Sequence, residues 1–152
     1  MTLIQCRRAD AKDVGDLASL RYTWRVEERG ERGLESSEFE SQLREWMSRH
    51  RETHLGYLAT HDDVAVGCAW LCIIDRVPGP GAFIRRAGAL QSVYVRSAQR
   101  NVGIGSELVR FVLGEAGSMK LDYLGVHPSE RSFAFYRRLG FSAAGRALEL
   151  RF

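Results

Sequence analysis

Cysteine, proline and long apolar runs are scarce in this sequence. Its 152 residues include three cysteines and three prolines. An odd cysteine count without a signal-peptide pattern after Met1 argues against a disulfide framework, and the cysteine spacing does not fit a zinc site, so no metal is expected. The longest apolar stretch, Val64 to Ile74, is shorter than the roughly 20 residues of a membrane span. These absences predict one domain over residues 1–152, located in the cytoplasm and without a membrane partner.

Charge is unevenly distributed along the chain. Residues 1–63 hold 10 Lys or Arg against 13 Asp or Glu, whereas residues 64–152 hold 12 against 6. The basic excess, with 20 Arg against 2 Lys, raises nucleic-acid binding as a rival function. No recognition helix, aromatic–basic interleaving or basic tail supports that function, so no nucleic-acid partner is expected.

Hydrophobic spacing and turn residues predict a mixed α/β fold, an α+β arrangement in which antiparallel hairpins precede a crossover unit. A central mixed sheet of six to seven strands flanked by about four helices is expected. Asp10 is the expected N-cap of the first helix, and Ser37 with Glu40 forms a capping-box pattern at the second. The expected elements are strands at 3–8, 54–60, 64–75, 89–96 and 121–126, helices at 10–28, from 37, at 103–116 and from 129 to Gly140, and one or two final strands within 141–152.

A loop between a strand and a helix is the most informative segment. It reads Arg-Asn-Val-Gly-Ile-Gly-Ser from Arg100 to Ser106. Unpaired amides and the helix dipole attract anions at a helix N-terminus, and Gly103 and Gly105 let an anion approach the backbone. A P-loop is excluded because Ser106 and Glu107 follow the last glycine, where Lys and then Ser or Thr are needed. A dinucleotide-binding turn fits poorly, since the third glycine is missing.

Two motifs together resemble a known family. Residues Arg100 to Gly105 resemble the Arg/Gln-x-x-Gly-x-Gly/Ala signature of the GNAT superfamily of acetyltransferases. About 30 residues later, Tyr136 to Phe141 resembles the Tyr-x-x-x-Gly-Phe element of the same superfamily. The resemblance implies a GNAT-like fold, acetyl-CoA as cosubstrate, and transfer of the acetyl group to a primary amine by direct attack in a ternary complex.

The resemblance also implies where acetyl-CoA binds. Main-chain groups at Val93 and Val95 would bind the pantetheine arm along a strand edge, and the Val93 amide would polarise the thioester carbonyl. The diphosphate would lie on the loop amides beside Arg100. An Asn that relatives often carry is replaced by Ser129, so Ser129 or Ser132 would bond the CoA arm instead. The implied binding residues are Val93, Tyr94, Val95, Arg100, Asn101, Val102, Gly103, Ile104, Gly105, Ser106, Ser129 and Ser132.

The implied catalytic acid is Tyr136, which matches the tyrosine that protonates the departing thiolate in many relatives. The same residue also fits a core aromatic on an amphipathic helix. The general base is open, because residues 89–92 lack a titratable side chain where relatives often carry Glu. Glu28, Asp75 and His127 are candidates, and a chain of waters is an alternative.

The acceptor is expected to be a cationic small molecule or peptide. Negative charge near an acceptor pocket favours a cationic amine, and the acidic half contains Glu27, Glu28, Glu31, Glu35, Glu38 and Glu40. Trp24, Trp46 and Trp70 either line that pocket or pack in the core. A catalytically silent sensor of acyl-CoA is the alternative function, and a homodimer is left open.

Overall fold

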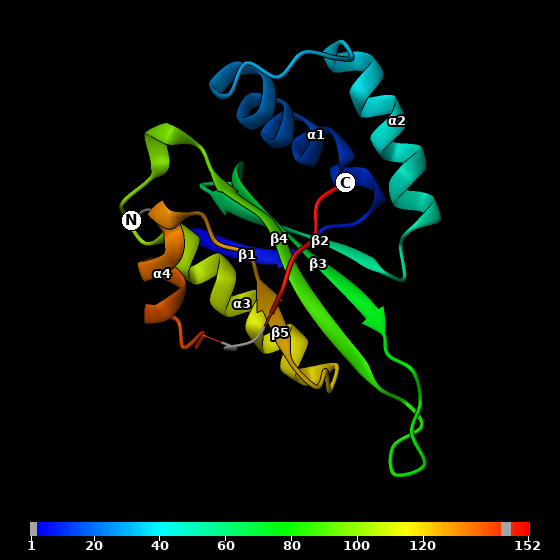
Figure 1. Ribbon diagram of the computed structural model, residues 1–152. Coiled ribbons are helices and arrows are strands. Elements are labelled where there is room, and N and C mark those ends of the chain that lie inside the picture. Colours follow the sequence, from blue (N-terminus) through cyan, green and yellow to red (C-terminus); the bar gives the residue numbers. More distant parts are fainter. Residues whose placement is uncertain (1–2, 144–146) are drawn as a thin grey trace.

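The fold is a twisted sheet with helices on both faces, seen in a computed structural model that describes residues 3–143 and 147–152 (Figure 1). The described strands form one five-stranded sheet in the order β1-β2-β3-β4-β5. The strands are β1 Ile4–Arg8, β2 His54–His61, β3 Val64–Asp75, β4 Arg86–Val95 and β5 Leu124–Val126. The helices are α1 Val14–Tyr22, α2 Ser36–Arg49, α3 Ile104–Ser118 and α4 Phe133–Arg138. A π-helical segment, Thr23–Glu28, continues α1.

The strand connections follow from local backbone chemistry. β2 and β3 are joined by Asp62 and Asp63, both with positive φ, as a two-residue hairpin turn requires. β3 and β4 are antiparallel and joined by the long loop of residues 76–85, which projects from the body in Figure 1. β4 and β5 are parallel, so the chain must cross over between them, and α3 makes that crossover.

Two hydrophobic clusters lie on opposite faces of the sheet. The period of two along each strand sends neighbours such as Tyr57 and Leu58 to different faces. One cluster packs α1 and α2 on the sheet and contains Leu17, Leu20, Leu58, Cys68, Trp70 and Tyr94. The other packs α3 and α4 on the sheet and includes Tyr57, Leu71, Leu90, Leu108, Val112 and Tyr136. No helix among the described residues is long and apolar enough to cross a membrane.

The predicted mixed α/β class is confirmed, and the predicted strand number is wrong. The described sheet has five strands, not six or seven. The described residues of the C-terminal segment, 141–143 and 147–152, form no strand, while 144–146 lie outside the described residues. Leu148, Leu150 and Phe152 alternate as in a strand but are exposed, so no apolar surface selects a strand register for them.

The two predicted helix caps had different outcomes. Asp10 is an N-cap as predicted, since it accepts a hydrogen bond from the Lys12 amide (2.9 Å) and caps the 3₁₀ turn Ala11–Asp13 that leads into α1. It also forms a capping box with Asp13, which was not predicted. The capping box predicted at Ser37 and Glu40 is wrong. α2 begins at Ser36, with Glu35 in the cap position, and no side chain caps it.

The Asp13 carboxylate joins the first helical turn to Arg7 of β1 through an ion pair that depends on pH. The carboxylate is buried (4% exposed), yet it accepts two hydrogen bonds of 2.7 Å from Arg7 and one of 2.9 Å from the Asp10 amide. The bonds from Arg7 outweigh the effect of burial and lower the pKa of Asp13 to about 2. Asp13→Asn is expected to lower the free energy of unfolding by about 2 kcal/mol at pH 7, because the paired charge is lost.

The pH dependence follows from the depressed pKa. The contribution of the Asp13 carboxylate is complete above the unfolded-state pKa near 4 and is lost as the pH falls toward 2. Urea unfolding should therefore separate wild type from Asp13→Asn at pH 7 and show a much smaller gap near pH 2.5. Glu45→Gln is the control, because its pair with Arg49 is exposed and should contribute less than about 1 kcal/mol. An equal gap at both pH values would contradict this account.

Candidate acyl-transfer site

β4 carries a bulge where it passes the middle of the sheet. Trp70 pairs with Gln91 and Cys68 with Tyr94, so β4 has one residue more than β3 over this stretch. Ser92 in the bulge has φ 54°. On its other side β4 pairs with β5 only as far as Leu90. Among the described strands, none therefore pairs with this edge of β4 after the bulge.

Main-chain groups after the bulge face this open edge. The Arg96 amide donates to the Val66 carbonyl of β3 (2.8 Å), so the alternation of an antiparallel ladder turns Val95 and Val93 away from β3. The Val95 carbonyl accepts a hydrogen bond from Arg100 Nε (2.8 Å). The amides of Val93 and Val95 and the carbonyl of Val93 are thus the groups that the open edge presents.

The N-terminus of α3 presents a run of donors close to that edge. Within the described residues, the six amides from Asn101 to Ser106 make no hydrogen bond, and Glu107 is the first in the helix with a partner, the Gly103 carbonyl at 3.1 Å. Asn101 and Gly103 have positive φ, 64° and 90°, which curls the loop ahead of the helix. Six free donors at the positive end of a 15-residue helix favour binding of an anion.

Gly105 brings three elements together at this place. A Cβ added to Gly105 would lie 3.6 Å from the Phe135 ring of α4 and 3.7 Å from the Val95 side chain of β4. The start of α3 is therefore packed directly against Val95 of β4, after the bulge, and against α4. The motif around Gly105 and the motif that follows Phe135 meet in space although about 30 residues separate them in sequence.

The structure explains the spacing of the second motif. Gly140 (φ 98°) donates to the Arg137 carbonyl and Phe141 donates to the Tyr136 carbonyl, both at 3.1 Å, which is a Schellman end to α4. Phe141 then packs edge-on against the Tyr136 ring, with centroids 5.5 Å apart. Burial raises the pKa of the Tyr136 phenol, so it is protonated at neutral pH. Tyr136 is thus a core residue and also a phenol kept in its acidic form.

Glu28 lies in a hydrogen-bonded network rather than in an acceptor pocket. It accepts from the Tyr94 hydroxyl (2.8 Å) and from Arg100 Nη2 (3.0 Å). Burial acts to raise the pKa of Glu28, but these bonds and the Arg100 charge outweigh it and the net shift is downward. A carboxylate held in this way is a weaker base, and the geometry gives it a positioning role toward Arg100 instead. Arg100 in turn is directed at Glu28 and Val95, not free to add its full charge to the loop.

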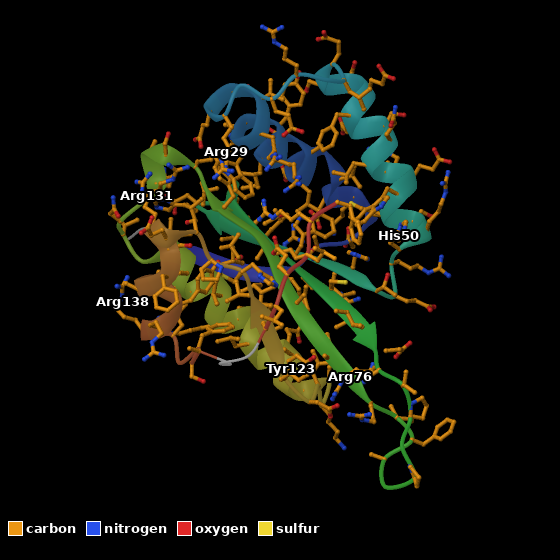
Figure 2. All side chains as sticks on the ribbon, viewed as in Figure 1. Arg29, His50, Arg76, Tyr123, Arg131 and Arg138 are labelled. Atoms are coloured by element: carbon orange, nitrogen blue, oxygen red, sulfur yellow. The ribbon has the colours of Figure 1, made fainter. Side chains whose placement is uncertain are left out.

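The other two predicted bases lie far apart, and His127 alone of the two is near the bulge. Asp75 is exposed and pairs with Arg86 at the end of β3 far from the bulge. It adjoins Arg76, which Figure 2 shows beside Tyr123, at the end of the molecule opposite Arg29 and Arg131. His127 is exposed and directly follows the last paired residue of β5, next to the place where β4 and β5 separate.

Ser129 and Ser132 form the turn that leads into α4. Ser129 caps this turn by accepting from the Ser132 amide (3.3 Å), and the two hydroxyl oxygens are 3.0 Å apart. Both side chains therefore have a structural role, and their expected bond to the CoA arm stays a prediction.

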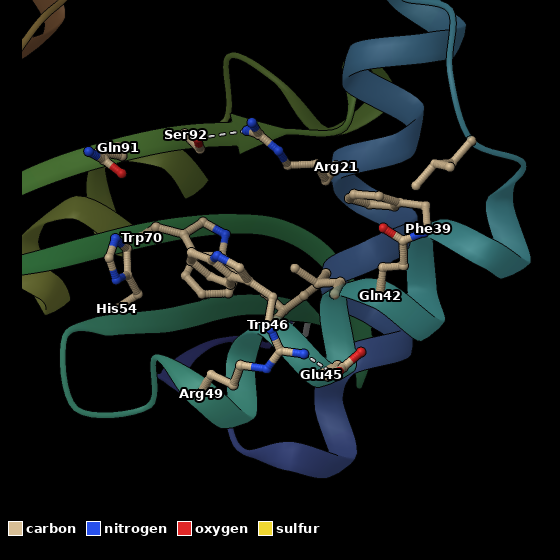
Figure 3. A pocket seen from close by; sticks show the side chains of 13 residues that line it. Arg21, Phe39, Gln42, Glu45, Trp46, Arg49, His54, Trp70, Gln91 and Ser92 are labelled. Atoms are coloured by element: carbon tan, nitrogen blue, oxygen red, sulfur yellow. Dashed lines mark hydrogen bonds and ion pairs between the residues drawn. The ribbon is translucent and has the colours of Figure 1, made fainter.

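A pocket of about 770 Å³ reaches the bulge from the face of the sheet that α1 and α2 cover (Figure 3). Gln91 and Ser92 of β4 form one end of it. Trp46 and Trp70 meet edge to face inside it, with centroids 5.9 Å apart, whereas Trp24 is stacked on Tyr94 at 5.6 Å and packs outside it. The lining residues are Leu17, Arg21, Leu34, Phe39, Gln42, Leu43, Glu45, Trp46, Arg49, His54, Trp70, Gln91 and Ser92.

The charges in the pocket differ from the predicted acidic wall. None of the six acidic residues expected to form that wall lines it. Glu31 lies in an adjoining cavity of about 270 Å³, where it pairs with Arg25, and Glu45 pairs with Arg49. Among the described residues, the pocket therefore shows no unpaired carboxylate that would favour a cationic amine.

Sequence reasoning missed two polar residues of the pocket, Arg21 and His54. Arg21 Nη1 donates to Ser92 Oγ (2.7 Å) across 71 positions of the chain. The sequence did contain a signal for Arg21, because it lies among the regularly spaced apolar residues of the first helix and not on its polar face. Burial, with the nearby His50, lowers the pKa of His54, so this imidazole is neutral at pH 7 and can accept a proton.

Comparison with known proteins agrees with this geometry. The model of the "Acetyltransferase (GNAT) family" matches residues 18–141. A predicted acetyltransferase from Clostridium acetobutylicum, solved with acetyl-CoA, superimposes with a TM-score of 0.78 at 20% identity, covering 98% of this chain and 96% of that one. Glucosamine-6-phosphate N-acetyltransferase from Arabidopsis thaliana gives a TM-score of 0.75 at 17% identity, with 99% of both chains covered. A search of curated proteins returned no significant match.

The family match covers most of the chain and includes both motifs, while the structural neighbours share the fold over nearly its whole length. The chain therefore belongs to the GNAT family of acetyltransferases.

Proposed function

We propose that this protein transfers the acetyl group of acetyl-CoA to a primary amine of a small molecule or peptide. The observation that carries the proposal is the run of six unpaired amides at the start of α3, packed against Val95 of β4. On the other side of the bulge lies a pocket large enough for a separate acceptor. The proposed acetyl-CoA site and the acceptor pocket both border β4. Both molecules can therefore be bound at the same time, as a ternary complex requires.

The residues present fit acetyl-CoA in two places. The amides of residues 101–106 offer donors and a helix dipole to a diphosphate. The edge groups of Val93 and Val95 can bond an extended amide-containing arm as a further strand would. Arg100 contributes less than the sequence suggested, because its guanidinium is hydrogen-bonded to Val95 and Glu28.

In the proposed reaction each residue acts on a specific atom. The Val93 amide donates to the thioester carbonyl oxygen and stabilises the negative charge that develops on it. The amine nitrogen forms a bond to the carbonyl carbon, the carbon–sulfur bond breaks, and Tyr136 donates a proton to the leaving sulfur. The proton lost by the amine passes to His54, His127 or water. Return of a proton to the Tyr136 phenolate then completes the cycle.

Two measurements test the proposal. Calorimetry should detect binding of acetyl-CoA to the purified protein, and a panel of amines should include one that releases free thiol from acetyl-CoA. Absence of binding heat would overturn the proposal entirely. Binding without thiol release from any amine would favour the silent acyl-CoA sensor.

A further inference from the structure

We infer that Arg21 is an anion-binding residue of the acceptor pocket, and that the acceptor is an amine with an acidic group close to its nitrogen and an apolar body. The acidic group is a carboxylate or a phosphonate, and an apolar α-amino acid is the simplest molecule of this description. The inference rests on the proposed function, because it names the substrate class of the same site.

Arg21 is part of the wall of the acceptor pocket. Arg21 lines both the 770 Å³ pocket and the adjoining 270 Å³ cavity, and its guanidinium bonds Ser92, which lines the larger of the two. It is half-buried, and Figure 3 shows it reaching from α1 toward Ser92 of β4. The Trp24 ring lies 5.8 Å from its guanidinium carbon. The side chain is held in place before any ligand arrives.

Within the described residues Arg21 forms no ion pair, and Glu31 acts on it only from beyond ion-pair distance. Of the other arginines that line these cavities, Arg49 pairs with Glu45 and Arg25 pairs with Glu31, while Arg32 is exposed to solvent. In the described part of the chain, no carboxylate oxygen lies within 4.0 Å of Arg21, and its hydrogen-bond partner is the neutral Ser92 hydroxyl. A half-buried cation without an ion-pair partner is costly, and binding of an acidic ligand would remove that cost.

The position of Arg21 relative to Val93 limits where the acidic group of the acceptor can lie. Ser92 is bonded to Arg21 at 2.7 Å and directly precedes Val93, whose amide is the proposed oxyanion donor. An anion on Arg21 would therefore lie near an amine that attacks beside Val93. A long spacer between the two groups would not fit this arrangement, whereas an α-amino acid does.

The remaining lining residues of the pocket indicate what kind of substituent the acceptor carries. Aromatic and aliphatic side chains dominate the wall away from Arg21, with Phe39, Leu43, Trp46 and Trp70 among them. Such a wall favours an apolar or aromatic substituent through burial of its surface.

A different role for Arg21 is direct stabilisation of the reacting carbonyl oxygen. That role would act on every acceptor equally and would lower kcat. An anion subsite acts on acidic acceptors alone and appears mainly in KM. Acceptors of matched shape with and without the acidic group separate the two roles.

The experiment compares L-phenylalanine, its phosphonate analogue, L-phenylalaninamide and 2-phenylethylamine as acceptors, followed by the wider set of apolar amino acids and their amides. Wild type is expected to favour the acidic member of a pair by about 10-fold or more in kcat/KM, and the first two compounds distinguish carboxylate from phosphonate. Arg21→Gln should raise KM for the acidic acceptor about 10- to 100-fold and leave the amide unchanged. Arg21→Lys should restore part of the loss.

Arg44→Gln is the control, because Arg44 is an arginine of α2 that lines neither cavity and pairs with Glu40. It should leave the preference for acidic acceptors intact. Tryptophan fluorescence supplies a readout without turnover, since titration with N-acetyl-L-phenylalanine should change the emission of Trp46 and Trp70 in wild type and not in Arg21→Gln.

The inference is overturned if wild type treats acids and amides alike, or if Arg21→Gln slows all acceptors equally. It is also overturned if the protein binds acetyl-CoA and acetylates only neutral or cationic amines, or none of the panel. In those cases the binding of acetyl-CoA still stands. Loss of acetyl-CoA binding itself would instead contradict the proposed function, so the two failures are distinguishable.

Discussion

Tyr136→Phe is expected to lower kcat about 100-fold while the affinity for acetyl-CoA stays within about twofold of wild type. The substitution removes the proposed proton donor and keeps the ring that packs between Phe135 and Phe141. The hydroxyl makes no hydrogen bond to the described residues, so the fold should lose little or no stability. Steady-state thiol release and calorimetry with acetyl-CoA measure the two quantities.

The pH profile tests the same role independently. Burial raises the pKa of Tyr136 above its ordinary value of 10, so the protonated acid persists through the neutral and mildly basic range. Wild-type kcat should therefore show a basic limb that falls only above about pH 10, and Tyr136→Phe should lack it. Tyr123→Phe is the control, because Tyr123 is 57% exposed and away from the loop. Unchanged kcat in Tyr136→Phe would leave Tyr136 as a core residue alone.

Val102→Asp is expected to raise the dissociation constant for acetyl-CoA about 10- to 100-fold. Val102 is 69% exposed in the middle of the six unpaired amides, so the fold can accept a polar side chain there. A carboxylate at this place would repel the diphosphate and compete with it for the same donors. The loss should shrink as salt is added, because the repulsion is screened. Calorimetry at two ionic strengths provides the measurement.

The stability of Val102→Asp shows whether a loss of affinity is due to misfolding. A negative charge at the N-terminus of α3 should stabilise the helix by about 0.3–1 kcal/mol, so affinity and stability are expected to change in opposite directions. Val102→Asn has nearly the same shape without the charge and should bind acetyl-CoA almost as wild type does. If Val102→Asp binds acetyl-CoA as tightly as Val102→Asn, the diphosphate does not lie on these amides.

The features that sequence predicted well are those that depend on short stretches of chain. Gly140 was predicted to end the last helix, and it does so with the positive φ that this helix end requires. The hairpin at Asp62 and the crossover to β5 follow from turn chemistry and from the length of the intervening helix. Rules of this kind use only neighbouring residues, so the sequence contains all the information that they need.

The features that sequence missed depend on which distant side chains meet. Charge counts indicated an acidic region, but they do not tell which carboxylates are neutralised, and Glu28 proved to be bound by Tyr94 and Arg100. Arg21 and Ser92 are far apart in sequence and meet only because α1 crosses the bulge of β4. The predicted C-terminal strands had the right alternation but no apolar partner among the described residues.

The single extra residue in β4 also decides which side chains share a face. In a regular strand Gln91 and Tyr94 would point to opposite sides, because they are three positions apart. With the insertion, both pair with β3 residues, Trp70 and Cys68, that face α1 and α2. Deleting one residue here would therefore move each later side chain of β4 to the opposite face of the sheet. The strand ladder would become more regular, while everything after the deletion, including the anchor of Arg100 at Val95, would turn over to the wrong side of the sheet.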